Sequence, residues 1–361
     1  MMPILRRIHR YIGLTLLTLW IIQAGTGVLM VFHWELSDAL LPGTHRAADW
    51  AALDGRVALL RAERPGSQLT AIYPTGGAPD RFDIFLDDSQ GRADVVRVDG
   101  GGTVLGEWPS EHDYAQAPWI ETAVILHQSL FAGQAGRWLL GASGTVLLIN
   151  LMLGLKLAWP PKGQWIRALS RFRGLPRSAR VRSWHRSLGL WLSLPALVFV
   201  TAGVLQAFDD PLEELLSAAP PIPVISRVGT TDVISPGQAV VRALAAFPGS
   251  SFSGLSTPAP DRPWYRVRVK QPGEIRRVFG TTAVYVSLAD GRTLGVNDAR
   301  QVSWRRRFLD ATYPTHTGEV GGLPGRLLAL ASGLVLLCVM VLGGTIWWRQ
   351  RDSRAVRMAA R

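Results

Sequence analysis

Four of the seven histidines of this chain occupy matching positions in two copies of one repeated segment. His9 in the first copy corresponds to His185 in the second, and His127 corresponds to His316. Imidazole is the commonest metal ligand in proteins. Two imidazoles on one haem iron fill both axial positions, which suits electron transfer better than oxygen chemistry. The pattern therefore predicts two bis-histidine haem sites.

Four apolar stretches accompany these histidines and predict membrane-spanning helices. Each contains 18 to 22 residues without a single Asp, Glu, Lys or Arg. A helix needs about 20 apolar residues to cross the hydrocarbon core of a bilayer. The first stretch is too long for the apolar region of a signal peptide and no small-residue cleavage site follows it, so we expect a retained helix. The stretches are 11–32, 138–155, 187–208 and 327–348.

Basic residues predict how these four helices are oriented. Lys and Arg accumulate before the first stretch, between the second and third, and after the fourth. Because basic residues favour the cytoplasmic side, we expect these segments and both termini in the cytoplasm. The long segments 34–118 and 209–312 hold nearly every acidic residue and are expected outside. The net charge of +12 thus follows from the membrane topology and indicates anionic lipid, and not nucleic acid, as the partner.

The two long outer segments also repeat each other. Each contains a predicted helix, a Pro-Gly-Ser turn and four short strands, which together predict an α+β domain. Each copy thus runs helix, outer domain, helix, and both copies begin in the cytoplasm, which makes them parallel repeats. The helices are expected at 55–63 and 238–246, and the strands at 69–73, 81–86, 95–98 and 100–105 in the first copy and at 252–256, 265–270, 283–288 and 290–294 in the second.

The predicted fold is an α-helical membrane protein with four transmembrane helices in two parallel repeats, plus two extracytoplasmic α+β domains. Its expected parts are an N-terminal tail with the first transmembrane helix (1–33), the first outer domain (34–118), an outer segment with the second helix (119–158), a basic cytoplasmic loop (159–183), the third helix (184–208), the second outer domain (209–312), an outer segment with the fourth helix (313–348) and a cytoplasmic tail (349–361).

The repeat predicts a common geometry for the histidines. A two-fold axis along the membrane normal brings equivalent residues to the same depth on opposite sides of the axis. We therefore expect His9 and His185 to share one haem iron near the cytoplasmic face, and His127 and His316 another near the outer face. Guanidinium groups contact carboxylates through paired hydrogen bonds, so four arginines are candidates to bind the haem propionates. These are Arg10, Arg186, Arg137 and Arg326.

Simpler interpretations of the histidines stay open from sequence alone. His9 and His185 could be interfacial anchors of their helices, and His127 and His316 could be ordinary surface residues of the segments before the second and fourth helices. His33, at the outer end of the first stretch, is a further candidate ligand or cap for the outer site, although its symmetric position holds no histidine.

Other cofactor classes lack their sequence signals. The one cysteine, Cys338, allows no disulfide within the chain, and the C-x-x-C-H motif of covalently attached haem is absent. No glycine-rich nucleotide fingerprint occurs either, so neither flavin nor nicotinamide is expected.

A His-Arg-x-x-Gly motif precedes both the first and the third apolar stretch, within Arg7-Ile8-His9-Arg10-Tyr11-Ile12-Gly13 and Trp184-His185-Arg186-Ser187-Leu188-Gly189. His127-Gln128-Ser129-Leu130 stands before Gly136-Arg137. With the two outer domains, these features resemble the PepSY-associated transmembrane (PepSY_TM) family of bacteria over essentially the whole chain. The second copy departs from the pattern, since Thr317-Gly318-Glu319 replaces Gln128-Ser129-Leu130, so the outer site is matched less well than the inner.

The resemblance implies a link to iron uptake, because some members are similar to inner-membrane reductases of ferric siderophores that carry two b-type haems. It implies haem ligation by His9 and His185 on the inner side and by His127 and His316 on the outer side. Electrons from a quinol or a cytoplasmic reductase are then expected to cross the membrane and reduce a ferric siderophore or another periplasmic acceptor.

A second hypothesis belongs to a different functional class. The chain could be a non-catalytic membrane protein whose PepSY-like domains bind a peptidase, a peptide or an envelope partner, with histidines that are purely structural. A transporter of iron complexes is disfavoured, because transporters place charged groups near mid-membrane and the four apolar stretches contain none.

Overall fold

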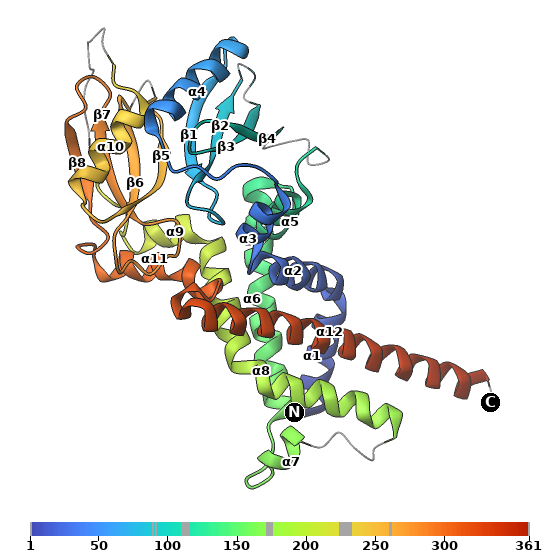
Figure 1. Ribbon diagram of the computed structural model, residues 1–361. Coiled ribbons are helices and arrows are strands. Elements are labelled where there is room, and N and C mark those ends of the chain that lie inside the picture. Colours follow the sequence, from blue (N-terminus) through green and yellow to red (C-terminus); the bar gives the residue numbers. More distant parts are fainter. Residues whose placement is uncertain are drawn as a thin grey trace. The chain divides into compact units, whose positions relative to one another are not determined.

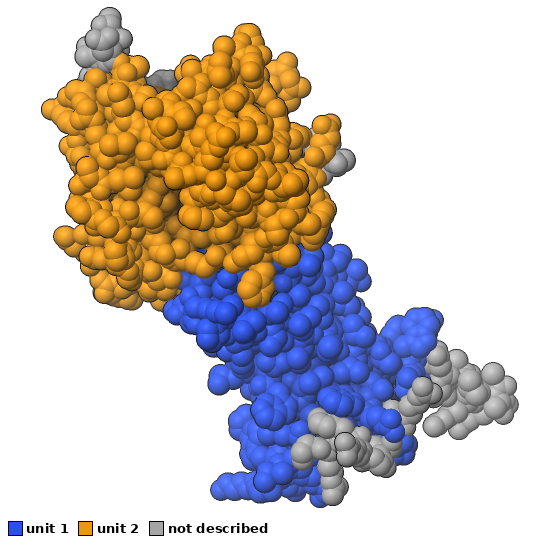
Figure 2. Space-filling model, in the orientation of Figure 1, with its two compact units in different colours: residues 1–31, 124–212, 312–361 blue, residues 32–123, 213–311 orange. Residues whose placement is uncertain are grey.

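The computed structural model describes residues 2–88, 90, 92–109, 116–170, 176–223, 233–259 and 262–359 (Figure 1). Part of the predicted basic loop, residues 171–175, lies outside these ranges, as do residues 360–361 of the predicted cytoplasmic tail. The chain forms two compact units (Figure 2). The helical unit contains Met1–Val31, Val124–Leu212 and Thr312–Arg361, and the sheet unit contains Phe32–Ala123 and Glu213–Ala311. Both copies of the repeat therefore contribute to both units.

Within the described residues, three helices of the helical unit are long and apolar enough to cross a membrane. They are α6 (Gly133–Ala158), α8 (Arg177–Ala207) and α12 (Gly322–Ala359). The first predicted span is a bent pair, α1 (Met2–Thr15) and α2 (Leu17–Met30), which meet at an angle of 65°. Counted as one span, this pair raises the number of membrane crossings to four.

The helices of this unit pack through contacts that occur once in each copy. Helix α8 packs against α6 and α12, while α12 also packs against α2 and α1 against α6 (Figure 1). Gly144 on α6 faces Val204 on α8, and the equivalent Gly333 on α12 faces Val28 on α2; a Cβ at either glycine would lie 2.8 Å from the valine Cγ2. Glycine is what lets the helix backbones approach this closely.

The sheet unit contains one antiparallel sheet of eight strands in the order β4-β3-β2-β1-β5-β6-β7-β8. The strands are β1 (Gln68–Pro74), β2 (Arg81–Asp87), β3 (Ala93–Asp99), β4 (Val104–Pro109), β5 (Ser251–Ser256), β6 (Trp264–Lys270), β7 (Thr282–Ser287) and β8 (Thr293–Asn297). Helices α4 (Trp50–Glu63) and α10 (Pro236–Ala246) cover one face, as Figure 1 shows. Their apolar residues join inward-facing strand residues of both copies in one buried core.

The two copies of the sheet meet where β1 pairs with β5, with Ile72 opposite Leu255. Each copy has a bulge in its first strand, between Leu69 and Ala71 and between Phe252 and Gly254. Two separate outer domains are expected from the sequence, whereas the structure joins the copies into a single sheet. The physical reason is that each four-stranded copy alone would leave the β1 or β5 edge unpaired.

Local capping explains where the two covering helices begin. The Asp49 carboxylate accepts hydrogen bonds from the backbone N–H groups of Ala51 and Ala52 at the start of α4. Ser235 and Gln238 form a reciprocal capping box at the start of α10, which also has Pro236 as its first residue. These caps satisfy N–H groups that a helix start otherwise leaves without partners.

The remaining helices are short. They are α3 (His33–Leu40), α5 (Trp119–Ser129), α7 (Trp165–Ser170), α9 (Asp209–Leu215), α11 (Trp304–His316) and the 3-10 turn η1 (Glu319–Gly321). Two of them, α5 and α11, end at or near a histidine of the outer pair, and both of those histidines belong to the helical unit.

Candidate functional site

The inner pair of histidines comes from the first helix of each copy. His9 on α1 and His185 on α8 have ring centres 6.3 Å apart, with ring planes inclined at 58°. His9 Nδ1 lies 3.1 Å from the backbone oxygen of Asn150, and His185 Nδ1 lies 2.9 Å from that of Val339. A carbonyl oxygen only accepts hydrogen bonds, so each Nδ1 donates. Nε2 is then the nitrogen that carries the lone pair.

The outer pair has a similar arrangement, except that a threonine hydroxyl replaces one of the backbone oxygens as hydrogen-bond acceptor. His127 on α5 and His316 on α11 have ring centres 6.2 Å apart and nearly parallel planes, at 25°. His316 Nδ1 lies 2.8 Å from the Phe199 backbone oxygen. His127 Nδ1 instead lies 3.0 Å from Thr26 Oγ1, whose own proton goes to the Ile22 carbonyl 2.8 Å away. Thr26 must therefore accept, and Nδ1 is again the donor.

Every histidine ring of the two pairs rests against a glycine of a neighbouring helix. A Cβ on that glycine would lie 2.6 to 3.3 Å from the histidine Cε1, which is closer than ordinary packing allows. The glycines occupy equivalent positions in the two copies, so both histidines of a pair have the same glycine contact. The contacts are His9 with Gly154, His185 with Gly343, His127 with Gly27 and His316 with Gly203.

These pairs have the spacing that a shared metal ion needs. Metal–imidazole bonds of about 2 Å and a ring radius of about 1 Å place two trans imidazole centres roughly 6 Å apart. Within the described residues, no group of three or more His, Cys, Asp or Glu side chains is arranged to hold a metal. Each pair offers two imidazoles, which is the protein ligand set of a bis-histidine haem. The residues fit haem.

A shallow cleft of about 510 Å³ lies between helices of the helical unit, and neither inner histidine is among its lining residues. Helices α1, α2 and α12 line it with mostly apolar side chains, and its wall includes Gly344, the neighbour of the glycine that contacts His185. Its lining residues include Leu14, Leu17, Trp347 and Trp348.

Comparison with known proteins agrees with this architecture. The model of the family described as the PepSY-associated TM region matches residues 6–350 of the chain. The chain belongs to the PepSY-associated TM family. It is also 28% identical over 270 residues to a protein of Pseudomonas aeruginosa described only as uncharacterized. That match covers 66% of this chain and 65% of the relative, so just under two thirds of the relative's length is matched.

Arg326 and Arg137, the outer arginines of this PepSY-associated protein, both contact groups within the protein. Arg326 is buried, and its Nε and Nη2 donate to the Val31 backbone oxygen over 3.3 and 2.7 Å. Its guanidinium thereby binds a carbonyl just beyond the end of α2. Arg137 is partly exposed and lies 3.6 Å from a carboxylate oxygen of Asp209. Of the two, Arg137 is the better placed to exchange its partner for a propionate.

The other predicted residues are less constrained. The Arg10 guanidinium lies 5.1 Å from the centre of the Tyr11 ring, and Arg186 is exposed. His33 begins α3 in the sheet unit, where its ring centre lies 4.9 Å from that of Trp34. The structure thus brings the four predicted ligands together in pairs, and it places His33 in the other unit.

Several residues that complete the histidine sites are absent from the sequence prediction. Gly154 and Gly343 contact the rings of the inner histidines. The Thr26 hydroxyl accepts a hydrogen bond from His127 of the outer pair. Matching glycines at equivalent positions of the repeat were the available signal for the first two. The backbone oxygens of Asn150 and Val339 carry no signal at all, since every residue has one.

Proposed function

We propose that this PepSY-associated membrane protein is a di-haem electron-transfer protein of the bacterial inner membrane, and that it reduces a periplasmic ferric siderophore in iron uptake. One observation carries the proposal: four imidazoles form two pairs, each made of equivalent residues of the two copies. The ring centres are 6.3 and 6.2 Å apart, and each Nδ1 has an oxygen as its hydrogen-bond partner. When bound, haem supplies one-electron redox chemistry at each pair.

Neighbouring groups fix the tautomer and the position of each candidate histidine ligand. An Nδ1–H bonded to a backbone oxygen sets the imidazole tautomer and increases the basicity of Nε2 as a ligand. Each glycine lies on the same helix as the acceptor of Nδ1, so that helix both receives the hydrogen bond and limits how closely the ring can approach. His9 with His185, and His127 with His316, would each hold one haem, and a haem held by two histidines would serve electron transfer and not oxygen chemistry.

The topology gives the reaction a direction. With both termini in the cytoplasm, His9 and His185 lie on the side of an electron donor, a quinol or a cytoplasmic reductase, and His127 and His316 on the side of the acceptor. Hard oxygen ligands hold Fe(III) much better than Fe(II), so reduction of a ferric chelate releases its iron. The lipid bilayer is the structural partner of the apolar helices.

The haem content of the purified full-length protein tests this proposal. We expect two haems per chain and a low-spin b-type absorption spectrum. The double variant His9→Ala/His185→Ala should lose one haem and keep the other, and His127→Ala/His316→Ala should do the reverse. His45→Ala is the matched control, because His45 is an exposed histidine of the sheet unit that contacts Asp80.

Two results would contradict the proposal. One is wild-type protein without haem when haem is supplied during expression, which would favour the binding-protein alternative. The other is a spectrum that survives unchanged in both double variants. Loss of haem in the His45 control to the same extent would show that the spectrum reports general damage to the protein and not ligation.

A further inference from the structure

The sheet has a second face, opposite α4 and α10, which we call the outward face; some of its side chains, such as Arg97 and Tyr285, are buried. Strands β2 and β6 occupy equivalent places on the two sides of the β1–β5 pair and have the same alternation of buried and half-buried residues. The half-buried positions of these two strands point to the outward face. Pairing shows the equivalence: Tyr73 of β1 is opposite Asp83 in the first copy, and Ser256 of β5 is opposite Arg266 in the second.

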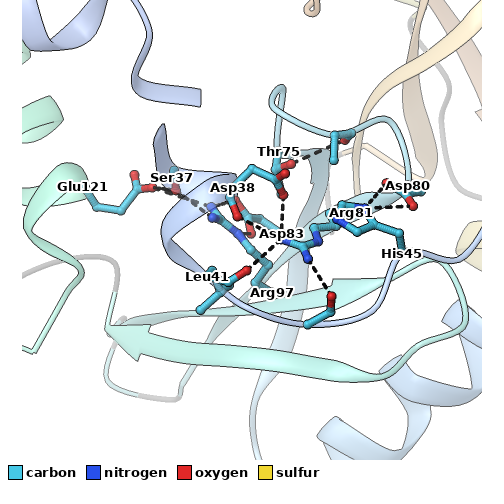
Figure 3. Close-up of polar contacts among 12 residues, drawn as sticks. Ser37, Asp38, Leu41, His45, Thr75, Asp80, Arg81, Asp83, Arg97 and Glu121 are labelled. Atoms are coloured by element: carbon cyan, nitrogen blue, oxygen red, sulfur yellow. Dashed lines mark hydrogen bonds and ion pairs between the residues drawn. The ribbon is translucent and has the colours of Figure 1, made fainter. Parts of the chain in front are cut away.

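Charges on the outward face of the first copy are neutralised within the protein. Arg97 Nε and Nη2 donate to the two carboxylate oxygens of Asp83 over 2.7 and 2.8 Å (Figure 3). Arg97 Nη1 also donates to Ser37 Oγ. Arg81 donates to the Asp38 carboxylate over 2.7 Å. Each buried guanidinium here has an acid as its partner, which is the usual condition for burying a charge.

The second copy has the opposite arrangement at the same positions. Arg266 stands where the first copy has Asp83, Arg268 where it has Phe85, and Tyr285 where it has Arg97. Among the described residues, no carboxylate forms an ion pair with Arg266 or Arg268. Arg266 Nε is buried and has no hydrogen-bond partner there. Two neighbouring positive charges are thus left without the anion that the first copy supplies.

Aromatic rings surround these arginines. The Arg268 guanidinium carbon lies 5.3 Å from the centre of the Tyr73 ring and 5.8 Å from that of Phe279. Gly254 beneath them has φ +149°, and a Cβ there would lie 2.5 Å from the Tyr73 ring, so glycine allows the tyrosine to reach the arginine. Burial lowers the pKa of Arg268, and the positive charges of Arg266 and Arg276 act in the same direction. A bound anion would offset the repulsion between these positive charges.

We propose that Arg266 and Arg268 bind an anionic ferric chelate whose donors are aromatic catecholates. This inference rests on the proposed function, for which it names the substrate class. Guanidinium groups form charge-assisted, paired hydrogen bonds with such oxygens. Rings like Tyr73 and Phe279 favour contact with a flat aromatic ligand. An uncharged hydroxamate chelate offers neither feature, so it should gain little from these residues.

Isothermal titration of the full-length protein in detergent with a gallium(III) tris-catecholate complex tests the inference. Gallium(III) has the charge of ferric iron but is not reduced under these conditions, so binding is separated from electron transfer. We expect the wild type to bind, and Arg266→Gln/Arg268→Gln to bind at least tenfold more weakly. Arg266→Lys/Arg268→Lys keeps the charge and should lose less. Added salt should weaken wild-type binding.

Matched controls make the result decisive. Arg242→Gln removes one positive charge from an exposed position on α10, on the other face of the same half, and should leave affinity unchanged. An uncharged gallium trihydroxamate should bind the wild type and the Gln variant equally. Hydrogen exchange of β6 checks that each variant is folded, and the Lys variant serves if the Gln variant is not.

Absence of wild-type binding would overturn the inference, as would equal affinity in the folded Gln variant and the wild type. Haem content distinguishes this failure from failure of the proposed function. Protein that contains two haems but does not bind the catecholate complex contradicts only the substrate assignment. Protein that binds the complex through both arginines but contains no haem contradicts the electron-transfer proposal and leaves the anion site in place.

Discussion

The two halves of the sheet have equivalent inward residues and different outward ones. Ile84 and Val267 occupy the same position and are both fully buried in the shared core. One residue earlier along each strand, Asp83 in the first copy is replaced by Arg266 in the second. Packing constrains the inward positions in both halves, whereas an outward position is constrained only by its own partners. Outward differences between the copies are therefore where a half acquires chemistry of its own.

The helical unit shows the other outcome of the same duplication. His9 with Gly154 and His185 with Gly343 make the same contact in the two copies. A site on a two-fold axis needs one ligand from each copy, so neither copy can lose its histidine without loss of the site. A site within one half, as proposed around Arg266, needs no counterpart in the other.

The largest effect that tests this comparison comes from the paired arginine. Arg97→Met leaves the Asp83 carboxylate half-buried without its partner and should lower the free energy of unfolding by about 3–5 kcal/mol. Arg266→Met removes no internal partner and should change it by less than about 0.5 kcal/mol. Hydrogen exchange of β2 and β6 in the full-length variants measures both. Equal losses would mean that the two halves do not differ in the way described.

A smaller effect is expected from the glycines that hold the histidines. In Gly203→Ala the new Cβ would lie 2.6 Å from His316 Cε1, so the ring must shift, at a cost of about 1–3 kcal/mol. In Gly343→Ala the contact with His185 is 3.3 Å, which a slight ring movement relieves. We expect loss of haem from the outer site in the first variant and near wild-type haem content in the second. Greater loss of haem in Gly343→Ala than in Gly203→Ala would contradict the role given to these glycines in positioning the histidine rings.

The smallest effect concerns an inward position that differs between the halves. Tyr265 donates its hydroxyl to the Ile234 backbone oxygen over 3.0 Å, and its first-copy counterpart is Phe82. Burial raises the pKa of Tyr265 to about 12. Tyr265→Phe should cost about 1 kcal/mol through the lost hydrogen bond.

The same variant has a pH signature. Unfolded tyrosine ionises near pH 10, whereas folded Tyr265 stays neutral until about pH 12, so wild-type stability should fall as pH rises between these values. Tyr265→Phe should remove this part of the decline. Thermal unfolding at pH 9, 10 and 11, followed by circular dichroism, provides the measurement. An identical slope in wild type and variant would show that Tyr265 does not contribute to it.

Much of the fold could be predicted because its signals are local. Strand alternation at 265–270 predicts β6 to within one residue. The apolar stretch at 138–155 lies inside α6, and the stretch at 187–208 extends one residue beyond the end of α8. The bend between α1 and α2 could not be predicted, since Leu16 at the break is neither proline nor glycine and has neither beside it. The joining of two predicted domains into one sheet depends on the pairing of Ile72 with Leu255, which are far apart in sequence.

The candidate site also has a part that could be predicted from the sequence and a part that could not. The duplication predicts which histidines pair, because equivalence of His9 and His185 can be seen in the sequence. The acceptors of their Nδ1 atoms are backbone oxygens, which any residue supplies. The arginine site around Arg266 was not predicted. Recognising it requires knowing that Ser256 and Tyr285, and no acid, stand opposite Arg266 on the neighbouring strands, and the sequence alone does not give this register.

Electron paramagnetic resonance of the oxidised full-length protein tests the central claim most directly. The account predicts two low-spin ferric haem signals of the bis-imidazole type, one lost in His9→Ala/His185→Ala and the other in His127→Ala/His316→Ala. A high-spin spectrum from haem-loaded protein, or two low-spin signals that persist in both double variants, would contradict the pairing of these four histidines on two irons.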